Sequence, residues 1–281
     1  MSHRAPILPD FETPSEAECE RGWKRWLLSH HLFVPMLALN GYCLERCAEA
    51  VAAERAQDEA SRWLDHAARM RCGCGSLFLY GVDFEPCAAI YCGYIRSRMP
   101  PAFSGYQARE RQNTFLPGLT AFRESLGRSG GGAAQARLRD QWVQADVHYH
   151  ERHQCCMLRA VSLAQVPNAY AHDTGSGNPE SLRAAYRRQH GVVPEIDIQA
   201  FNEFDDWFGI ERRESLTWAE YGAEVARVVG EIVSDLEEGH RLQPNVISDL
   251  FDSMNAVLAI LEERPGERHA TGERNVGLLF A

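Results

Sequence analysis

Residues 141–164 constrain the fold most, because their apolar side chains recur at intervals of three and four. That spacing places them on one face of an α-helix. His153 lies within this face, and His150 lies one turn earlier on its flank. A histidine on an apolar face is either a core residue with one hydrogen bond or a ligand, and the helix alone allows both interpretations. With one preceding turn, the face comprises Leu138, Trp142, Ala145, Tyr149, Cys156, Ala160 and Leu163.

Zinc is one ligand that such a helix could bind, because histidine and cysteine are its preferred protein ligands. Structural zinc usually takes paired ligands from two separated segments. Here only Cys72 and Cys74 could form the second group, and their spacing is C-x-C. Zinc, haem and a purely structural helix are all compatible with residues 141–164.

Length and charge narrow the class of protein. A chain of 281 residues that is 45% hydrophobic, with long helical patterns, predicts a single all-α domain over residues 1–281. Residues 1–12 and 267–281 are expected to be loose tails. A net charge of −10 argues against nucleic-acid and anionic-membrane surfaces, because binding phosphate needs a positive field. A small-molecule partner is therefore expected.

The cellular compartment is predicted from two further features. No window approaches eighteen uninterrupted apolar residues, and the N-terminal residues lack the apolar core of a signal peptide. Nine cysteines in a chain of this length are expected to be reduced thiols. Both features predict a cytoplasmic protein.

The first helix is predicted to begin at Thr13-Pro14-Ser15-Glu16, which offers an N-cap, a proline at the first helical position and a capping-box glutamate. It passes His30 and His31, and Pro35 predicts a kink or break. Two adjacent histidines point about 100° apart on a helix, so one can face a pocket while the other stays on its flank. Core or surface histidines without a chemical role are the alternative.

The middle of the chain is predicted to contain a loop and a pocket wall. Residues 43–70 continue the helical pattern, and two glycines in RCGCGS, residues 71–76, predict a loop. Residues 77–98 are aromatic-rich and apolar on most sides, which favours a buried helix pair or a pocket wall. Met99-Pro100-Pro101 ends this segment.

The later segments are predicted from their breakers. Residues 130–132 are three glycines, which predict a flexible connection before the histidine helix. A small-residue loop follows it at residues 172–177, and residues 178–191 are predicted to form a further helix. Two structural helices are expected over Trp218–Glu238 and residues 246–263, because each carries a regular aliphatic stripe.

Three segments together resemble the tryptophan/indoleamine 2,3-dioxygenase superfamily of haem enzymes. Those enzymes carry their proximal histidine in a pattern that His153, Met157, Arg159 and Val161 match. Their Gly-Thr-Gly-Gly loop, followed by a helix with Leu-Arg, resembles residues 173–177 and Leu182-Arg183, although Asp173 replaces the first glycine. Met99-Pro100-Pro101-Ala102 resembles the Met-Pro-Pro-Ala of indoleamine dioxygenases.

Two looser similarities lie upstream. Residues 28–31 resemble the Thr-His-Gln segment that gives tryptophan dioxygenases a distal histidine. Residues 104–107 resemble their Ser-Gly-Phe-Gln, which precedes a carboxylate-binding arginine; that arginine would fall near Arg111, one position out of register. The separation between residues 104–107 and His153 is shorter than in tryptophan dioxygenases. In this shorter arrangement the chain is most similar to the haem-dependent L-tyrosine hydroxylases of natural-product pathways. The resemblance covers residues 26–190.

The resemblance implies a helical bundle that encloses a haem, with His153 as the iron ligand. His30 or His31 would be the distal catalytic residue, which orients a phenol and moves its proton. The remaining implied roles are propionate binding by Arg96, Arg98 and Arg159, with Arg152 a further candidate, and amino-acid binding by Arg111, Thr174 and Ser176. Dioxygen and peroxide both remain open as the oxidant.

The expected reaction is hydroxylation of L-tyrosine, or an analogue, to a 3-hydroxytyrosine product. Ring cleavage of tryptophan is one alternative, and a non-catalytic haem or metal sensor that uses His148, His150 and Cys155-Cys156 is another. Related peroxygenases that bind haem covalently carry a His-x-x-x-Cys arrangement, which the spacing from His150 and His153 does not match, so haem b is expected to be non-covalent. Superfamily relatives are often oligomers, and a homo-oligomer is left open.

Overall fold

The computed structural model describes residues 14–53, 57–95, 115–128, 132–161 and 218–263, and within these ranges it contains helices and no strand. This confirms the predicted all-α class. The elements are α1 (Glu16–Ala52), α2 (Gln57–Tyr80), α3 (Cys87–Ala89), the π-helix η1 (Ile90–Ile95), α6 (Leu116–Arg128), α7 (Ala133–Val161), α11 (Trp218–Glu238) and α12 (Pro244–Glu262).

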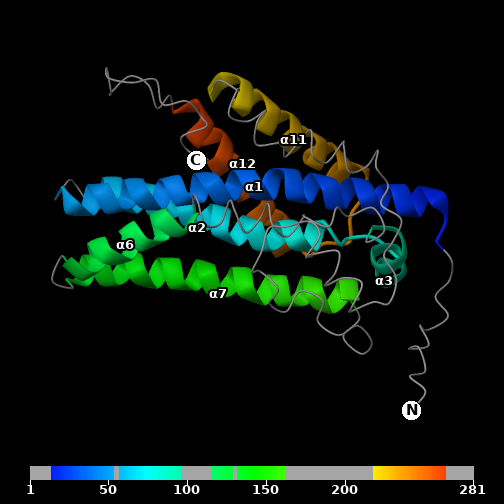
Figure 1. The fold of residues 1–281 in the computed structure, drawn as a ribbon, viewed down its shortest axis with the longest axis horizontal. Coiled ribbons are helices and arrows are strands. Elements are labelled where there is room, and N and C mark those ends of the chain that lie inside the picture. Colours follow the sequence, from blue (N-terminus) through cyan, green and yellow to red (C-terminus); the bar gives the residue numbers. More distant parts are fainter. Residues whose placement is uncertain (1–13, 54–56, 96–114, 129–131, 162–217, 264–281) are drawn as a thin grey trace, which may run out of the picture.

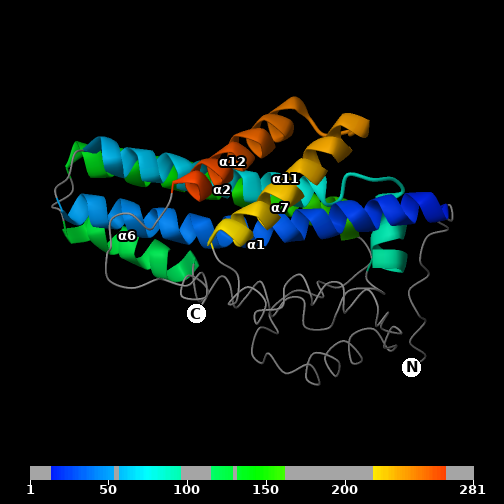
Figure 2. The same cartoon turned by 90° about the horizontal axis from the view of Figure 1, so that it is seen from above.

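The long helices α1, α2 and α7 run side by side along the longest axis of the protein (Figures 1 and 2). Helix α2 lies between the other two and packs on both. Helix α6 packs on α1, while α11 and α12 cross the long helices obliquely and pack on α1 and α2. This arrangement brings the helix that carries His30 and the helix that carries His153 onto a shared neighbour, α2.

Helix α1 begins at a complete capping box. The Ser15 hydroxyl accepts a hydrogen bond from the Glu18 amide at 3.3 Å, and the Glu18 carboxylate accepts one from the Ser15 amide at 2.7 Å. A capping box was predicted correctly at the start of this helix, but its N-cap is Ser15 and not Thr13. A kink or break was predicted at Pro35, and the helix continues through this residue without a break.

The prediction of a loop over residues 71–76 was also wrong, because α2 runs through them without interruption. Gly73 and Gly75 mark close helix contacts instead. A Cβ at Gly73 would overlap the side chain of Ser253 on α12, and one at Gly75 would lie 3.1 Å from the Tyr149 Cα on α7. Glycine is therefore needed where α12 and α7 approach the backbone of α2. The helical pattern predicted across residues 43–70 is in fact two helices, with α1 ending at Ala52.

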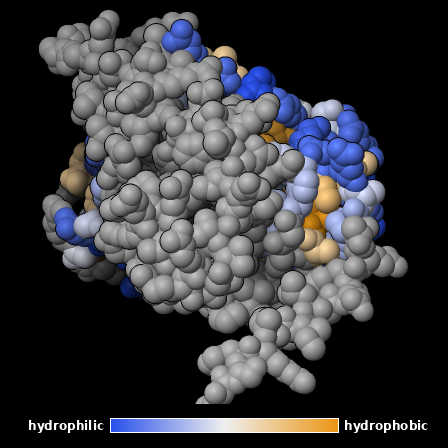
Figure 3. All heavy atoms as spheres, turned by 45° about the vertical axis from the view of Figure 1, so that its right-hand side comes forward, coloured by the Kyte–Doolittle hydropathy of each residue, from blue (hydrophilic) through white to orange (hydrophobic). Residues whose placement is uncertain are grey.

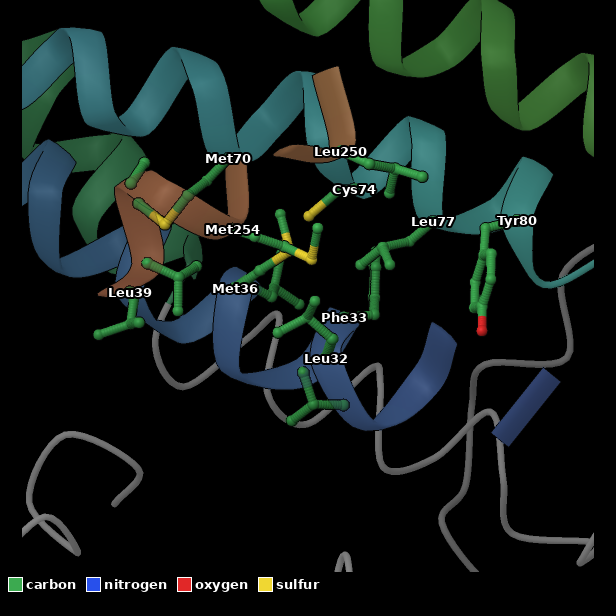
Figure 4. Close-up of a cluster of buried hydrophobic side chains, with 14 of the residues drawn as sticks. Leu32, Phe33, Met36, Leu39, Met70, Cys74, Leu77, Tyr80, Leu250 and Met254 are labelled. Carbon is green, nitrogen blue, oxygen red and sulfur yellow. The ribbon is translucent and has the colours of Figure 1, made fainter. Parts of the chain in front are cut away.

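The hydrophobic core lies where α1, α2 and α12 meet (Figure 4). Sulfur-bearing side chains from all three helices gather at its centre, where Met36, Cys74 and Met254 lie close together. Methionine fills irregular space between helices, because its unbranched chain adapts to its neighbours. The surrounding residues are Leu32, Phe33, Leu39, Met70, Leu77, Tyr80 and Leu250.

A buried group of charges ties α1 to the end of α2 and to α11. Arg25 is 4% exposed and contacts the carboxylates of Asp83, at 3.1 Å, and Asp235, at 2.7 Å. Arg25 also donates to the carbonyl oxygens of Asp83 and Gly239, and the Tyr80 hydroxyl donates to Asp235 at 3.1 Å. Such a group persists in an apolar interior only when each charge has partners.

Helix α1 is the one described helix that is long and apolar enough to cross a membrane, and 89% of its most apolar window is buried inside the protein. That burial is what the central helix of a packed bundle requires. Where the described residues are visible in Figure 3, hydrophilic side chains predominate, with apolar side chains between them.

Several predicted features lie outside the described residues. These are the tails at residues 1–12 and 267–281, the break at Met99-Pro100-Pro101, the loop at residues 172–177 and the helix at residues 178–191. The two structural helices near the C-terminus are confirmed. Helix α11 has the predicted bounds, and α12 begins two residues earlier than predicted and ends one residue earlier.

Candidate functional site

Helix α7 positions His153. The periodic apolar face predicted for this helix packs on α2, with Leu138, Trp142, Ala145, Cys156 and Ala160 all buried. His153 lies at the edge of that face and is half-buried. The helix extends from Ala133, directly after Gly132, so the glycine run marks its start as predicted.

The His153 imidazole lies in an aromatic cluster between α7, α2 and α1. The centroid of its ring is 4.8 Å from that of Phe78, and 6.1 Å from that of Tyr149, whose plane is parallel to it within 2°. Phe78 in turn lies 5.0 Å from Phe33 on α1. The predicted apolar wall over residues 77–98 therefore contributes Phe78, which α2 carries, to the surroundings of His153.

Both nitrogens of the His153 ring are available to a ligand within the part of the chain that the structure describes, since no hydrogen bond or ion pair there involves either atom. Burial, followed by the neighbouring His150 and Arg71, lowers the pKa of His153. A neutral imidazole is the form that binds a metal. These features fit a haem-iron ligand, which must be neutral, partly buried and held on a rigid element.

A buried cation lies behind the Tyr149 ring. The guanidinium carbon of Arg71, on α2, is 3.5 Å from the centroid of Tyr149, and Arg71 forms an ion pair of 2.6 Å with Asp146. Arg71 is 6% exposed. The predicted loop over residues 71–76 concealed this residue. In a helix through those positions, Arg71 lies two turns before Phe78 on the same face. That seven-residue spacing could have indicated from the sequence that Arg71 lies near the site.

His30 lies on α1, three residues before Phe33, and is buried. Its Nδ1 atom is 2.6 Å from the carbonyl oxygen of Trp26, and its ring is 4.1 Å from the Trp26 ring. A carbonyl oxygen only accepts hydrogen bonds, so Nδ1 carries the proton and Nε2 of the neutral ring carries a lone pair. Burial lowers the pKa of His30 to about 4, against the smaller opposing effect of this hydrogen bond.

His31 is buried as deeply as His30, at 8% exposure each. Pro35 lies four residues after it and has no amide hydrogen, so the carbonyl oxygen of His31 does not receive the usual helical hydrogen bond.

The side chains of the alternative metal sensor point to different partners. His148 Nε2 lies 3.0 Å from Asp249 on α12, whereas His150 Nε2 lies 3.8 Å from Asp146 on α7 itself. Cys155 is exposed and Cys156 is buried, and burial raises the pKa of Cys156 to about 12. Across the described ranges, no three histidine, cysteine, aspartate or glutamate side chains are grouped to hold a metal ion.

The arginines expected at the haem propionates differ in their surroundings. Arg159 lies 3.2 Å from the carboxylate of Glu85 and 3.4 Å from that of Asp83, so it joins the end of α7 to the segment after α2. Arg152 is buried, with Asp249 at 2.5 Å, and donates to the Ser76 hydroxyl. The propionate role of Arg159 stays a prediction. Arg96, Arg98, Arg111, Thr174 and Ser176 lie outside the described residues.

A family model of known proteins matches part of the chain. Residues 3–141, just under half of the chain, match the family model described as SfmD 3-methyl-L-tyrosine peroxygenase. The matched part includes α1 with His30 and His31, and it ends before His153. It supports a tyrosine-modifying peroxygenase, and it does not extend to the tryptophan/indoleamine dioxygenase superfamily as such. No curated protein and no solved structure matched the chain.

Proposed function

We propose that the protein is a haem-dependent peroxygenase that hydroxylates the ring of L-tyrosine or a close analogue in a natural-product pathway. The observation that carries this proposal is the match of residues 3–141 to a 3-methyl-L-tyrosine peroxygenase family, because this part holds the buried histidines of α1. The reaction would convert an aromatic C–H and hydrogen peroxide into a phenol and water.

The proposed cofactor is non-covalent haem b with His153 as its protein ligand. When bound, haem would supply the oxidising chemistry by activating peroxide. The support is the half-buried, neutral imidazole on a 29-residue helix, with the rings of Phe78 and Tyr149 beside it. Cys156 is a poor candidate for a thioether link, because burial keeps its thiol protonated.

We assign the distal role to His30. Its Nδ1–H is held by the Trp26 carbonyl, so Nε2 can accept a hydrogen bond from a phenol hydroxyl and hold that proton while the ring is attacked. Burial keeps the imidazole neutral at physiological pH, so its second nitrogen can act as a hydrogen-bond acceptor. His31 is assigned a packing role beside it.

The carboxylate and ammonium groups of the amino acid are proposed to bind Arg111, Thr174 and Ser176, as the resemblance implies. The matched family favours peroxide over dioxygen as the oxidant, and 3-methyl-L-tyrosine over L-tyrosine as the substrate to test first. Haem propionates are proposed to bind Arg96 and Arg98, with Arg159 as a third candidate.

The test is incubation of the haem-loaded protein with hydrogen peroxide and either 3-methyl-L-tyrosine or L-tyrosine, followed by mass spectrometry. Gain of one oxygen atom, with a catechol absorbance, supports the proposal. Parallel reactions with L-tryptophan, dioxygen and reductant detect ring cleavage, which would replace hydroxylation as the function. Haem-loaded protein that modifies none of these amino acids contradicts the proposal.

A further inference from the structure

The His153 ring is held by neighbouring rings. Metal-binding histidines commonly donate their second N–H to a carboxylate or carbonyl group, which fixes the plane of the imidazole. Within residues 14–53, 57–95, 115–128, 132–161 and 218–263, no such acceptor bonds to His153. Instead, the parallel Tyr149 ring and the tilted Phe78 ring lie beside it, at 6.1 and 4.8 Å between centroids. Among the described residues, the contacts that can orient the His153 ring are therefore these two ring contacts.

The Tyr149 ring is itself fixed by a buried cation. Arg71 places its guanidinium carbon 3.5 Å from the ring centroid, and two of its nitrogens contact Asp146 Oδ1, at 2.8 and 2.6 Å. A cation over an aromatic face is worth more when water is excluded, and the Arg71 side chain is 8% exposed. The planar guanidinium restricts the tilt of the ring that it covers. Arg71 belongs to α2 and Tyr149 to α7, so this contact couples the orientation of the Tyr149 ring to the position of a second helix.

We propose that Arg71, acting through the Tyr149 ring and held by Asp146, is a positioning residue that fixes the plane of the His153 imidazole. This inference rests on the proposed function, because a fixed plane matters only if His153 binds the haem iron. In this arrangement a cation and aromatic packing orient the His153 imidazole. Many other metal-binding histidines are oriented by a hydrogen bond to an anionic side chain.

The first measurement uses the haem-free protein. We would assign the His153 ring carbons by comparison with His153→Gln and measure their relaxation by nuclear magnetic resonance. Tyr149→Leu and Arg71→Met should lower the order parameter of the ring, whereas Tyr149→Phe, which keeps the aromatic face, should leave it unchanged. Asp146→Asn should lower it less than Arg71→Met. Arg69→Met is the matched control, since Arg69 lies on the same helix and pairs only with the exposed Asp65 among described residues.

The second measurement uses the haem-loaded protein. Tyr149→Leu and Arg71→Met should alter the rhombicity of the ferric electron paramagnetic resonance spectrum and should speed haem loss to apomyoglobin by about 10-fold, the usual scale for losing the outer support of a metal ligand. Tyr149→Phe and Arg69→Met should match the wild-type protein. If Arg71→Met fails to fold, Asp146→Asn, which removes the anion that holds Arg71, and Tyr149→Leu still decide.

The two proposals fail in different ways. Unchanged His153 ring order in both Tyr149→Leu and Asp146→Asn overturns the positioning role, whether or not the protein binds haem. Normal haem spectra in His153→Ala overturn the iron-ligand assignment, even if Tyr149→Leu still loosens the ring in the haem-free protein.

Discussion

The Nδ1 atom of His30 lies 2.6 Å from the carbonyl oxygen of Trp26, one helical turn earlier on α1. This contact fixes which ring nitrogen carries the proton, and burial keeps the ring neutral. The contact therefore defines the tautomer of His30.

The pH dependence of stability should reveal the buried His30. Because the folded state lowers the pKa of His30 from 6.5 to about 4, the unfolded chain binds more protons between these values. The contribution of His30 to stability is thus present above pH 6.5 and is lost as the pH falls towards 4. For this residue, the free energy of unfolding should decrease by about 2 kcal/mol between pH 7.5 and pH 5.

Urea unfolding at both pH values, for the wild-type protein and His30→Asn, checks this prediction. Asparagine can still donate to the Trp26 carbonyl, but it does not titrate. The decrease should be smaller in the variant by about 2 kcal/mol. Equal decreases in the two proteins would show that His30 is not the titrating group.

His30→Asn should also separate catalysis from haem binding. Loss of the Nε2 acceptor should lower kcat for hydroxylation by about 10²–10⁴, the range for a general base, while the haem spectrum is retained. His31→Asn is the comparison and should lower kcat less. A His30→Asn enzyme with wild-type turnover, measured by product formation under saturating peroxide, would assign the distal role elsewhere.

The buried charges around Arg25 should dominate stability. Arg25→Met leaves the buried Asp235 without its arginine and leaves Asp83 with Arg159 alone, and it should lower the free energy of unfolding by about 4 kcal/mol. Arg69→Met removes an exposed pair with Asp65 and should cost at most about 0.5 kcal/mol. Chemical denaturation measures both, and equal effects would mean that the buried pair is dispensable.

Gly73 should tolerate no side chain. A Cβ there would overlap Ser253 and would lie 2.8 Å from the Met36 Sδ-bound methyl, so Gly73→Ala should destabilise the protein by about 2 kcal/mol. Adding Ser253→Gly should recover part of that loss. Gly230→Ala, on α11 with open space around it, should instead stabilise the protein by about 0.5–1 kcal/mol. Thermal unfolding of the four proteins checks the order, and a neutral Gly73→Ala would contradict the close helix contact.

The helices were predictable wherever one apolar face repeats, because burial of that face decides the local structure. Helix α11 was predicted with its bounds, and the apolar face of α7 was predicted correctly, although His153 lies at the edge of that face and not within it. Gly73 and Pro35 misled because their local preferences oppose a helix. Tertiary packing decided both positions, as α12 needs the space at Gly73 and the surrounding helices bury Pro35.

The polar contacts of the site were less predictable, because they join residues far apart in the chain. Arg25 and Asp235 are separated by 210 positions, and Arg71 and Asp146 by 75. Periodicity places a side chain on a face but does not pair it with a partner on another helix. The orientation of Tyr149 by Arg71 therefore required the packed helices.

Titration of haemin into wild-type protein, His153→Ala and His150→Ala tests whether His153 is the haem ligand. Wild-type protein and His150→Ala should develop the same Soret band at one haem per chain. In His153→Ala that band should be lost, and added imidazole should restore it. A wild-type protein that binds no haem, or a His153→Ala variant with an unchanged Soret band, would show that His153 is not a haem ligand.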